Sequence, residues 1–221
     1  MMNFIFETLL IFTVTRQSAI ASTFVGNGGN SKDVELQVTL LQIQKSLKQV
    51  QQDGAQNEAL CECDSNLEGH KLCEVLKALN TDQKKQCKEE LFQASNQMLN
   101  LLQDPKGVQI IWTLETMQVS EKAGLRQAEG VAVLKEKKIF LNREEFLNLK
   151  DYERIYLVTH ELAHLVPFNQ KYIQDDEKYK SFQQDDGGRQ FLNALGASVA
   201  MKSFETGAIS DYVASLNRSK N

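Results

Sequence analysis

Residues 151–165 read DYERIYLVTHELAHL, and the organisation of the chain is best argued from this stretch. Four apolar residues recur along it at helical spacing: Ile155, Val158, Leu162 and Leu165. Such spacing places them on one face of a helix. Asp151 is a favourable helix cap, and Pro167 cannot continue a helix. The sequence therefore predicts a long helix from Asp151 to about Val166 with a buried apolar face.

The pentapeptide His160-Glu161-Leu162-Ala163-His164 lies inside this predicted helix. Because residues four apart share a face, both imidazoles can reach one zinc ion at about 2.0–2.1 Å. Glu161 is one step round the helix, where its carboxylate can contact the water molecule on that ion without binding the ion itself. The pattern predicts His160 and His164 as metal ligands and Glu161 as the catalytic base. The alternative is a helix whose histidines are ordinary surface or core residues.

The pentapeptide and its surroundings resemble the zincin superfamily of zinc metallopeptidases. The resemblance covers the predicted helix and a predicted hairpin before it that ends in Lys138-Ile139-Phe140-Leu141-Asn142. In zincins an edge strand ahead of the active-site helix binds extended substrate, and the hairpin over 131–141 is similar to it. The resemblance implies an α+β fold, with a small antiparallel sheet, the active-site helix and C-terminal helices, and a zinc-dependent peptidase. It indicates the superfamily but no particular family.

A third zinc ligand has to come from elsewhere in the chain. Metzincins continue with Gly and then His at positions where this chain has Pro167 and Gln170, so that clan is excluded. Gluzincins take a carboxylate from the next helix, about twenty residues on, which makes Asp186 the first choice. Four other carboxylates stay open as alternatives: Asp185, Asp176, Glu177 and Glu205. Asp186 also suits a turn or a helix cap before two glycines.

The group that would stabilise the transition state is not assigned. Four residues after the motif could polarise a carbonyl oxygen: Tyr172, Tyr179, Arg189 and Tyr212. Tyrosines in such positions also serve as packing residues, and Arg189 could instead pair with a neighbouring aspartate.

The first residues form an apolar stretch followed by Ala19-Ile20-Ala21. Small side chains at these positions predict a signal peptide, residues 1–21, cleaved after Ala21. An uncleaved anchor and a buried helix are the alternatives; the stretch is shorter than the roughly 20 residues that span a bilayer. The predicted location is outside the cytoplasm, in the periplasm, at the cell surface or secreted.

All four cysteines, Cys61, Cys63, Cys73 and Cys87, fall within one segment. Export would allow two disulfides, and the CxC spacing disfavours a bond between Cys61 and Cys63, so each is expected to pair with Cys73 or Cys87. The alternative is a zinc cluster in which the cysteines bind metal together with His70.

The chain divides by pattern into a flexible linker, 22–32, a helical segment with the cysteines, 33–105, and a zincin-like domain, 106–221. In the helical segment we expect a helix from about Leu40 and one or two helices over 72–102. In the zincin-like domain we expect a strand over 108–114, the hairpin, a short helix capped by Asn142, and a helix over 189–205 before a short one over 209–216.

Composition limits the function further. The chain has 221 residues, 24% of them charged, and a net charge of -4, so we expect one catalytic domain with an appendage and no binding to nucleic acid or anionic membrane. The predicted partner is a peptide or protein substrate, and the predicted cofactor is zinc. The second hypothesis is an exported zinc-binding or structural protein that keeps a non-catalytic HExxH helix.

Overall fold

The computed structural model describes residues 31–54, 60–63, 71–121, 124–166 and 187–205. The fold is α+β, as expected. The helices are α1 (Ser31–Asp53), α2 (Lys71–Lys77), α3 (Thr81–Gln103), α4 (Arg143–Asn148), α5 (Asp151–Leu165) and α7 (Gly187–Glu205), with a short 3-10 turn over Leu134–Glu136. The strands are β1 (Gln109–Thr113), β2 (Met117–Glu121), β3 (Gly124–Ala128), β4 (Gly130–Val133) and β5 (Lys138–Asn142).

The main sheet has the strand order β1-β5-β4. Strands β4 and β5 are antiparallel, with Ala132 opposite Ile139, which confirms the predicted hairpin. Strand β1 is parallel to β5, with Ile110 opposite Ile139. The expectation of an antiparallel sheet was therefore wrong, and the sheet is mixed. The long connection between β1 and β5 lets the chain re-enter the sheet in its original direction, as parallel pairing requires.

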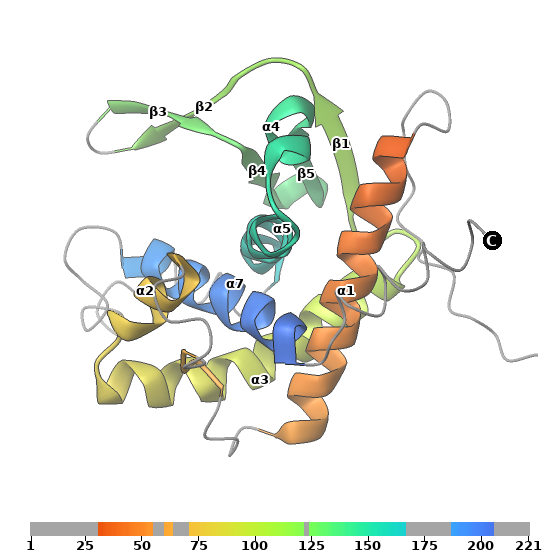
Figure 1. Ribbon diagram of the computed structural model, residues 1–221. Helices are drawn as coiled ribbons and strands as arrows, with labels where there is room; N and C mark the ends of the chain where they lie inside the picture. Colours follow the sequence, from red (N-terminus) through yellow and green to blue (C-terminus); the bar gives the residue numbers. More distant parts are fainter. Residues whose placement is uncertain (1–30, 55–59, 64–70, 122–123, 167–186, 206–221) are drawn as a thin grey trace, which may run out of the picture.

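A second hairpin, β2–β3, was not predicted from the sequence. Its strands read MQVSE and GLRQA and pair in antiparallel register. Strand β2 alternates only from Met117 to Ser120 and β3 does not alternate, so the pair lacks the longer alternation that is typical of a half-buried strand. The hairpin extends away from the body of the molecule beside β4 (Figure 1).

The first helix begins earlier than expected. The stretch 34–40 alternates like a strand, yet it lies within α1, and helix starts at Ser31, inside the stretch expected to be linker. Five buried residues explain this: Leu36, Leu40, Ile43, Leu47 and Val50. Their spacing of four and three residues continues one helical face without interruption. The Trp112 indole nitrogen donates to Asp33 Oδ1 at 3.1 Å, which joins the start of α1 to β1.

The segment over 72–102 forms two helices. Asn80 separates them, because its side chain accepts a hydrogen bond from the Gln83 backbone nitrogen while the Gln83 side chain accepts one from Asn80 nitrogen, both at 2.9 Å. This capping box starts α3. The six residues expected on its apolar face and that of α2 are all buried: Leu76, Leu79, Leu91, Met98, Leu99 and Leu102.

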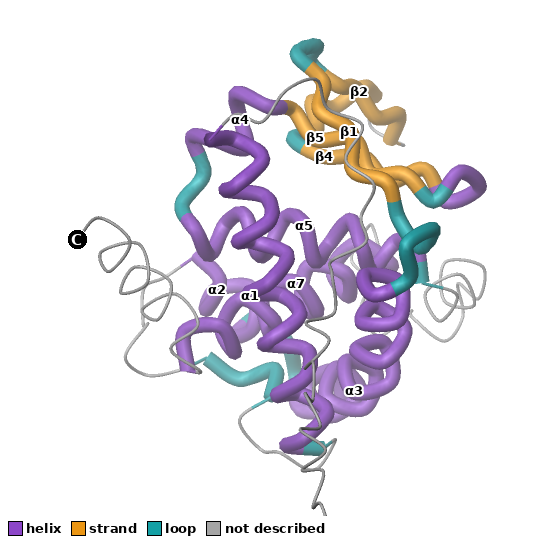
Figure 2. Tube along the Cα trace, turned by 90° about the vertical axis from the view of Figure 1, so that its right-hand side faces the viewer, coloured by secondary structure: helices purple, strands orange, loops and turns teal. Residues whose placement is uncertain are grey.

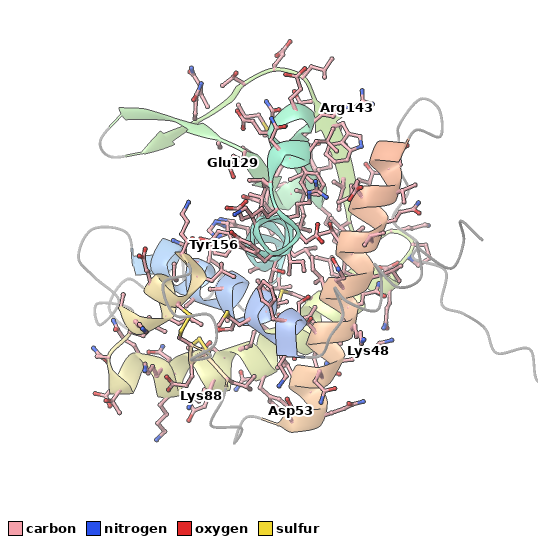
Figure 3. The ribbon with its side chains drawn as sticks, viewed as in Figure 1. Lys48, Asp53, Lys88, Glu129, Arg143 and Tyr156 are labelled. Carbon is pink, nitrogen blue, oxygen red and sulfur yellow. A yellow bond between two sulfur atoms is a disulfide. The ribbon has the colours of Figure 1, made fainter. Side chains whose placement is uncertain are left out.

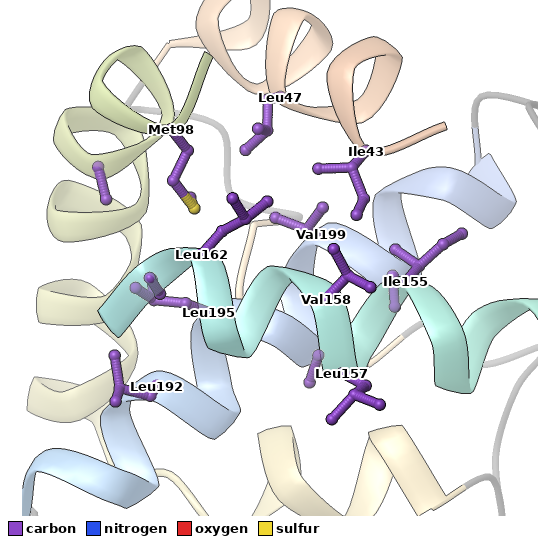
Figure 4. Close-up of a cluster of buried hydrophobic side chains, with 14 of the residues drawn as sticks. Ile43, Leu47, Met98, Ile155, Leu157, Val158, Leu162, Leu192, Leu195 and Val199 are labelled. Carbon is purple, nitrogen blue, oxygen red and sulfur yellow. The ribbon is translucent and has the colours of Figure 1, made fainter. Parts of the chain in front are cut away.

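Helix α5 lies at the centre of the fold, between the sheet and the other helices (Figures 1 and 2). Figure 4 shows its buried side chains among those of α1, α3 and α7. Ile155, Val158 and Leu162 are completely inaccessible to solvent. Burying such side chains contributes roughly 1.5–3 kcal/mol each. One hydrophobic core therefore holds α5 in a fixed orientation, and residues from the cysteine segment and from the C-terminal segment share it.

Two disulfides close the cysteine segment, Cys61–Cys87 and Cys63–Cys73. Both follow the expected rule that each member of the CxC pair bonds to one of the later cysteines. Since all four sulfur atoms are used, the alternative of a cysteine zinc cluster is not what the structure shows. Within the described ranges, no helix combines the length and the apolar character needed to cross a membrane.

Candidate metal and catalytic site

The start of α5 is set by a short turn after α4. Asn142 caps α4 as predicted, its side chain accepting hydrogen bonds from the Glu144 and Glu145 backbone nitrogens. Helix α5 follows, and the Glu153 carboxylate accepts a hydrogen bond from the Lys150 backbone nitrogen at 2.9 Å. Lys150, and not Asp151, is therefore the residue at the cap position. The helix ends at Leu165, close to the predicted end. Because its apolar face is buried in the core, the opposite face lies towards the sheet and α2.

His160 and His164 lie on that opposite face, one turn apart. Their Nε2 atoms are 3.3 Å from each other, and their ring centroids are 5.0 Å apart. Two nitrogens that bind one tetrahedral zinc ion at about 2.05 Å would be separated by about 3.3–3.4 Å. The two imidazoles therefore converge in the manner that a shared zinc ion requires. Within the described residues, these two nitrogens are the donors that α5 would offer to such an ion.

The protonation state of His164 suits the same role. Desolvation by burial lowers the pKa of His164 from 6.5 to about 4. The imidazole is consequently neutral at pH 7, and a neutral imidazole is the form that binds metal. No proton has to be displaced from His164 when a cation arrives.

Glu161 faces strand β4. Only 5% of the residue is exposed. A Cβ atom added at Gly130 would come within 3.0 Å of Glu161 Cγ and 3.3 Å of Glu161 Cδ, so the absence of a side chain at Gly130 leaves the space that the carboxylate side chain uses. Helix α5 and strand β4 are thus in close contact at the predicted base.

Asn142 holds the backbone next to Gly130 in place. Its own backbone nitrogen donates to the Glu129 carbonyl at 2.9 Å, and its side-chain nitrogen donates to the Glu115 carbonyl at 3.3 Å. Asn142 is 5% exposed. One buried side chain therefore caps α4 and, together with its backbone, fixes the segment that leads into β4.

A cleft of about 330 Å³ opens beside His160 and Glu161. Its walls come mainly from α5, from the segment 127–130 that joins β3 to β4, and from α2 of the cysteine segment, and Leu149 together with Asn193 of α7 completes the lining. Figure 3 shows Tyr156 of α5 and Glu129 on the same side of the molecule, where this cleft lies. The cleft places a substrate-sized space directly against the two predicted functional residues.

The structure brings together three of the predicted site residues and leaves the others outside its described part. His160, Glu161 and His164 share α5, and within the described ranges no group of three metal-binding side chains forms. Asp186, Asp185, Asp176 and Glu177 lie outside the described residues, as do Tyr172, Tyr179, Tyr212 and the predicted signal peptide. Glu205 and Arg189 belong to α7, but their side chains are outside the description.

Sequence reasoning missed two contributors to the site, Tyr156 and helix α2. Tyr152, Tyr156, His160 and His164 form a single row at four-residue spacing along α5, and this spacing could have identified the tyrosines as neighbours of the two histidines. The approach of α2 to the cleft depends on tertiary packing and has no counterpart in the local sequence. The role of Gly130 was likewise not visible from its neighbours.

No protein-family model matches the chain, and neither a curated protein nor a solved structure resembles it at a significant level.

Proposed function

We propose that this protein is a zincin-like, zinc-dependent peptidase that acts outside the cytoplasm. The observation that carries the proposal is the 3.3 Å separation of the His160 and His164 Nε2 atoms on one face of a buried helix. The position of Glu161, which lines the same cleft as His160, supports it. Two imidazole nitrogens that can hold a metal ion and an adjacent carboxylate are groups that metal-assisted hydrolysis of an amide uses.

In this proposal His160 and His164 hold the metal, and Asp186 is the proposed third ligand. Zinc, when bound at such ligands, lowers the pKa of water towards 7 and polarises a carbonyl group. The Glu161 carboxylate accepts the proton of the attacking water and returns it to the nitrogen of the leaving amine. Because Glu161 is almost fully buried against Gly130, its side chain is held in position before substrate arrives.

The proposed substrate is an extended peptide. Strand β4 is at the end of the described three-stranded sheet, and its first residue lines the cleft. An edge strand offers backbone donors and acceptors to which a peptide can pair as an additional strand. Such pairing would bring a peptide bond to Glu161 without requiring a particular sequence along the whole substrate.

Export is the second part of the proposal. The two disulfides require an oxidising compartment to form and persist. The apolar start of the chain and the Ala19-Ile20-Ala21 site supply the corresponding route.

The decisive experiment uses Glu161→Gln. Zinc-loaded wild type should cleave casein or a peptide library, and Glu161→Gln should lose roughly 10²- to 10⁴-fold in rate because an amide cannot accept the proton. The variant should retain its zinc and its fold. Glu144→Gln, at an exposed position on α4, is the matched control and should cleave like wild type. Equal rates for Glu161→Gln and wild type, with contaminating protease excluded, would refute the peptidase.

A non-catalytic HExxH protein is the second candidate, and one observation favours it. The distance of 3.3 Å between the Nε2 atoms also allows a hydrogen bond between one protonated and one unprotonated ring nitrogen. Zinc binding separates the two candidates, because two imidazoles that merely bond to each other would leave the protein without metal.

A further inference from the structure

The cleft has a chemical character that the catalytic residues alone do not explain. On α2 and α5, five of the lining residues are apolar or aromatic: Leu72, Val75, Tyr152, Tyr156 and Leu157. Leu72 and Leu157 are 4% and 8% exposed. The other three are partly buried. Two charged residues that also line the cleft, Lys71 and Glu129, are exposed. The cleft therefore has an apolar surface on α2 and α5, and Glu153, His160 and Glu161 of α5 add polar groups to its lining.

The apolar surface comes from two different elements. Tyr152 and Tyr156 belong to the same row of α5 as the two histidines, which places an aromatic surface one turn before His160. Leu72 and Val75 are three residues apart, so they lie on one face of α2, and both line the cleft. Helix α2 is held by the Cys63–Cys73 disulfide and packs against α7. The cysteine segment thus supplies the wall that faces the active-site helix.

The size of the cleft limits what can fill it. A volume of about 330 Å³ is near the lower end of the range of roughly 300–1,000 Å³ seen for ligand pockets. This volume suits one large side chain with its adjacent backbone. Because Glu161 lines the same space, that side chain would belong to a residue next to the bond that is cleaved.

We propose that the cleft selects peptides with a large apolar side chain beside the scissile bond, and that Leu72 and Val75 of α2 determine this preference. The inference rests on the proposed function. It assigns the disulfide-bonded segment a part in substrate selection, in addition to its part in the core. Val75 is the more informative position to change, because it is only partly buried and Leu72 is almost fully enclosed.

The experiment measures binding, so that it does not depend on turnover. Two peptide hydroxamates that differ only in a benzyl or a methyl side chain are titrated into zinc-loaded protein by calorimetry. Wild type should bind the benzyl compound roughly 10- to 100-fold more tightly, as expected for burying a phenyl group. Val75→Phe fills the space and should reduce this ratio to near one. Glu74→Phe adds the same ring on an exposed face of α2, outside the cleft lining, and should keep the wild-type ratio.

Tyr156→Ala provides a second variant on the opposite wall, should Val75→Phe fail to fold. Tyr156→Ala should lower the affinity for the benzyl compound and leave the affinity for the methyl compound unchanged. An equal affinity of wild type for both compounds, or equal behaviour of Val75→Phe and Glu74→Phe, would overturn the inference. If the protein cleaves peptides without preferring an apolar side chain, the proposed selectivity of the cleft is refuted and the proposed peptidase activity is not. If the protein holds zinc and distinguishes the two hydroxamates but cleaves no peptide, the proposed selectivity of the cleft is supported and the proposed peptidase activity is refuted.

Discussion

Arg154 Nη1 donates a hydrogen bond to Glu35 Oε2 at 2.6 Å, which joins helix α5 to helix α1. The same guanidinium donates through Nε to the Phe146 carbonyl at 3.1 Å and through Nη2 to the Leu147 carbonyl at 2.8 Å. The Arg154 side chain is 11% exposed, whereas that of Glu35 is 40% exposed. Arg154 therefore connects α1, α4 and α5, and its carbonyl contacts are the better shielded from water.

We expect Arg154→Met to lower the free energy of unfolding by roughly 2–4 kcal/mol, because two carbonyls lose their charged donor in a poorly hydrated place. Glu35→Gln should cost less than about 1 kcal/mol, since its half of the ion pair is solvated. Urea unfolding of both variants measures the difference. A larger loss of unfolding free energy in Glu35→Gln than in Arg154→Met would show that the ion pair, and not the carbonyl contacts, dominates the contribution of Arg154.

His160→Ala and His164→Ala should each lose the zinc that wild type carries, because two remaining ligands bind the metal weakly. Metal analysis after dialysis against a mild chelator measures the stoichiometry, which should be about one in wild type and in Glu161→Gln. Full retention of zinc in both histidine variants would end the metal hypothesis. Asp186→Asn should weaken zinc affinity as well as rate if Asp186 is the third ligand.

The metal-free protein should lose stability on acidification through His164. Its pKa is about 4 in the fold and 6.5 ordinarily, so the unfolded chain takes up this proton first as the pH falls. The free energy of unfolding therefore declines from about pH 6.5 towards pH 4, and between pH 7 and pH 5 this group accounts for roughly 1–2 kcal/mol. Urea midpoints in the presence of chelator should show a shallower decline for His164→Gln. Identical pH profiles would exclude this role.

Gly130→Ala should reduce the hydrolytic rate by roughly tenfold while zinc stays bound, because the added methyl group would come within 3.0 Å of Glu161 Cγ. Small displacements of a catalytic group act on rate more than on affinity, so kcat should fall with KM little changed. Zinc content and thermal unfolding serve as controls. A rate equal to that of wild type would show that Glu161 tolerates the displacement.

Thiol titration of protein from an oxidising compartment should find no free thiol before reduction, since all four cysteines are bonded. The double variant Cys63→Ser with Cys73→Ser should retain zinc, lose roughly 2–4 kcal/mol of stability and lose discrimination between the benzyl and methyl hydroxamates. The double variant Cys61→Ser with Cys87→Ser is the matched control and should keep more of that discrimination. Four free thiols in the oxidised protein would contradict the pairing.

The sequence predicted those parts of the fold that depend on neighbouring residues. The helix over 151–165, the hairpin before it and the cap at Asn142 each have a local cause in spacing or side-chain chemistry, and the structure contains all three. The parallel pairing of β1 with β5 and the approach of α2 to the cleft arise from packing between distant segments, which a single sequence does not reveal. The spacing of His160 and His164 is local, so their convergence could be predicted. The contact between Gly130 and Glu161 joins distant segments, so it could not.

The burial of α5 beneath α7 also constrains when the site can form. Val158 and Leu162 pack with Leu195 and Val199, so the active-site helix lacks part of its core until the chain beyond Val199 has been synthesised (Figure 4). A nascent chain emerges with its HExxH residues well before these partners. We expect such a chain to hold no organised cleft, so that any ligand of the cleft could bind only after the residues around Leu195 and Val199 have joined the core.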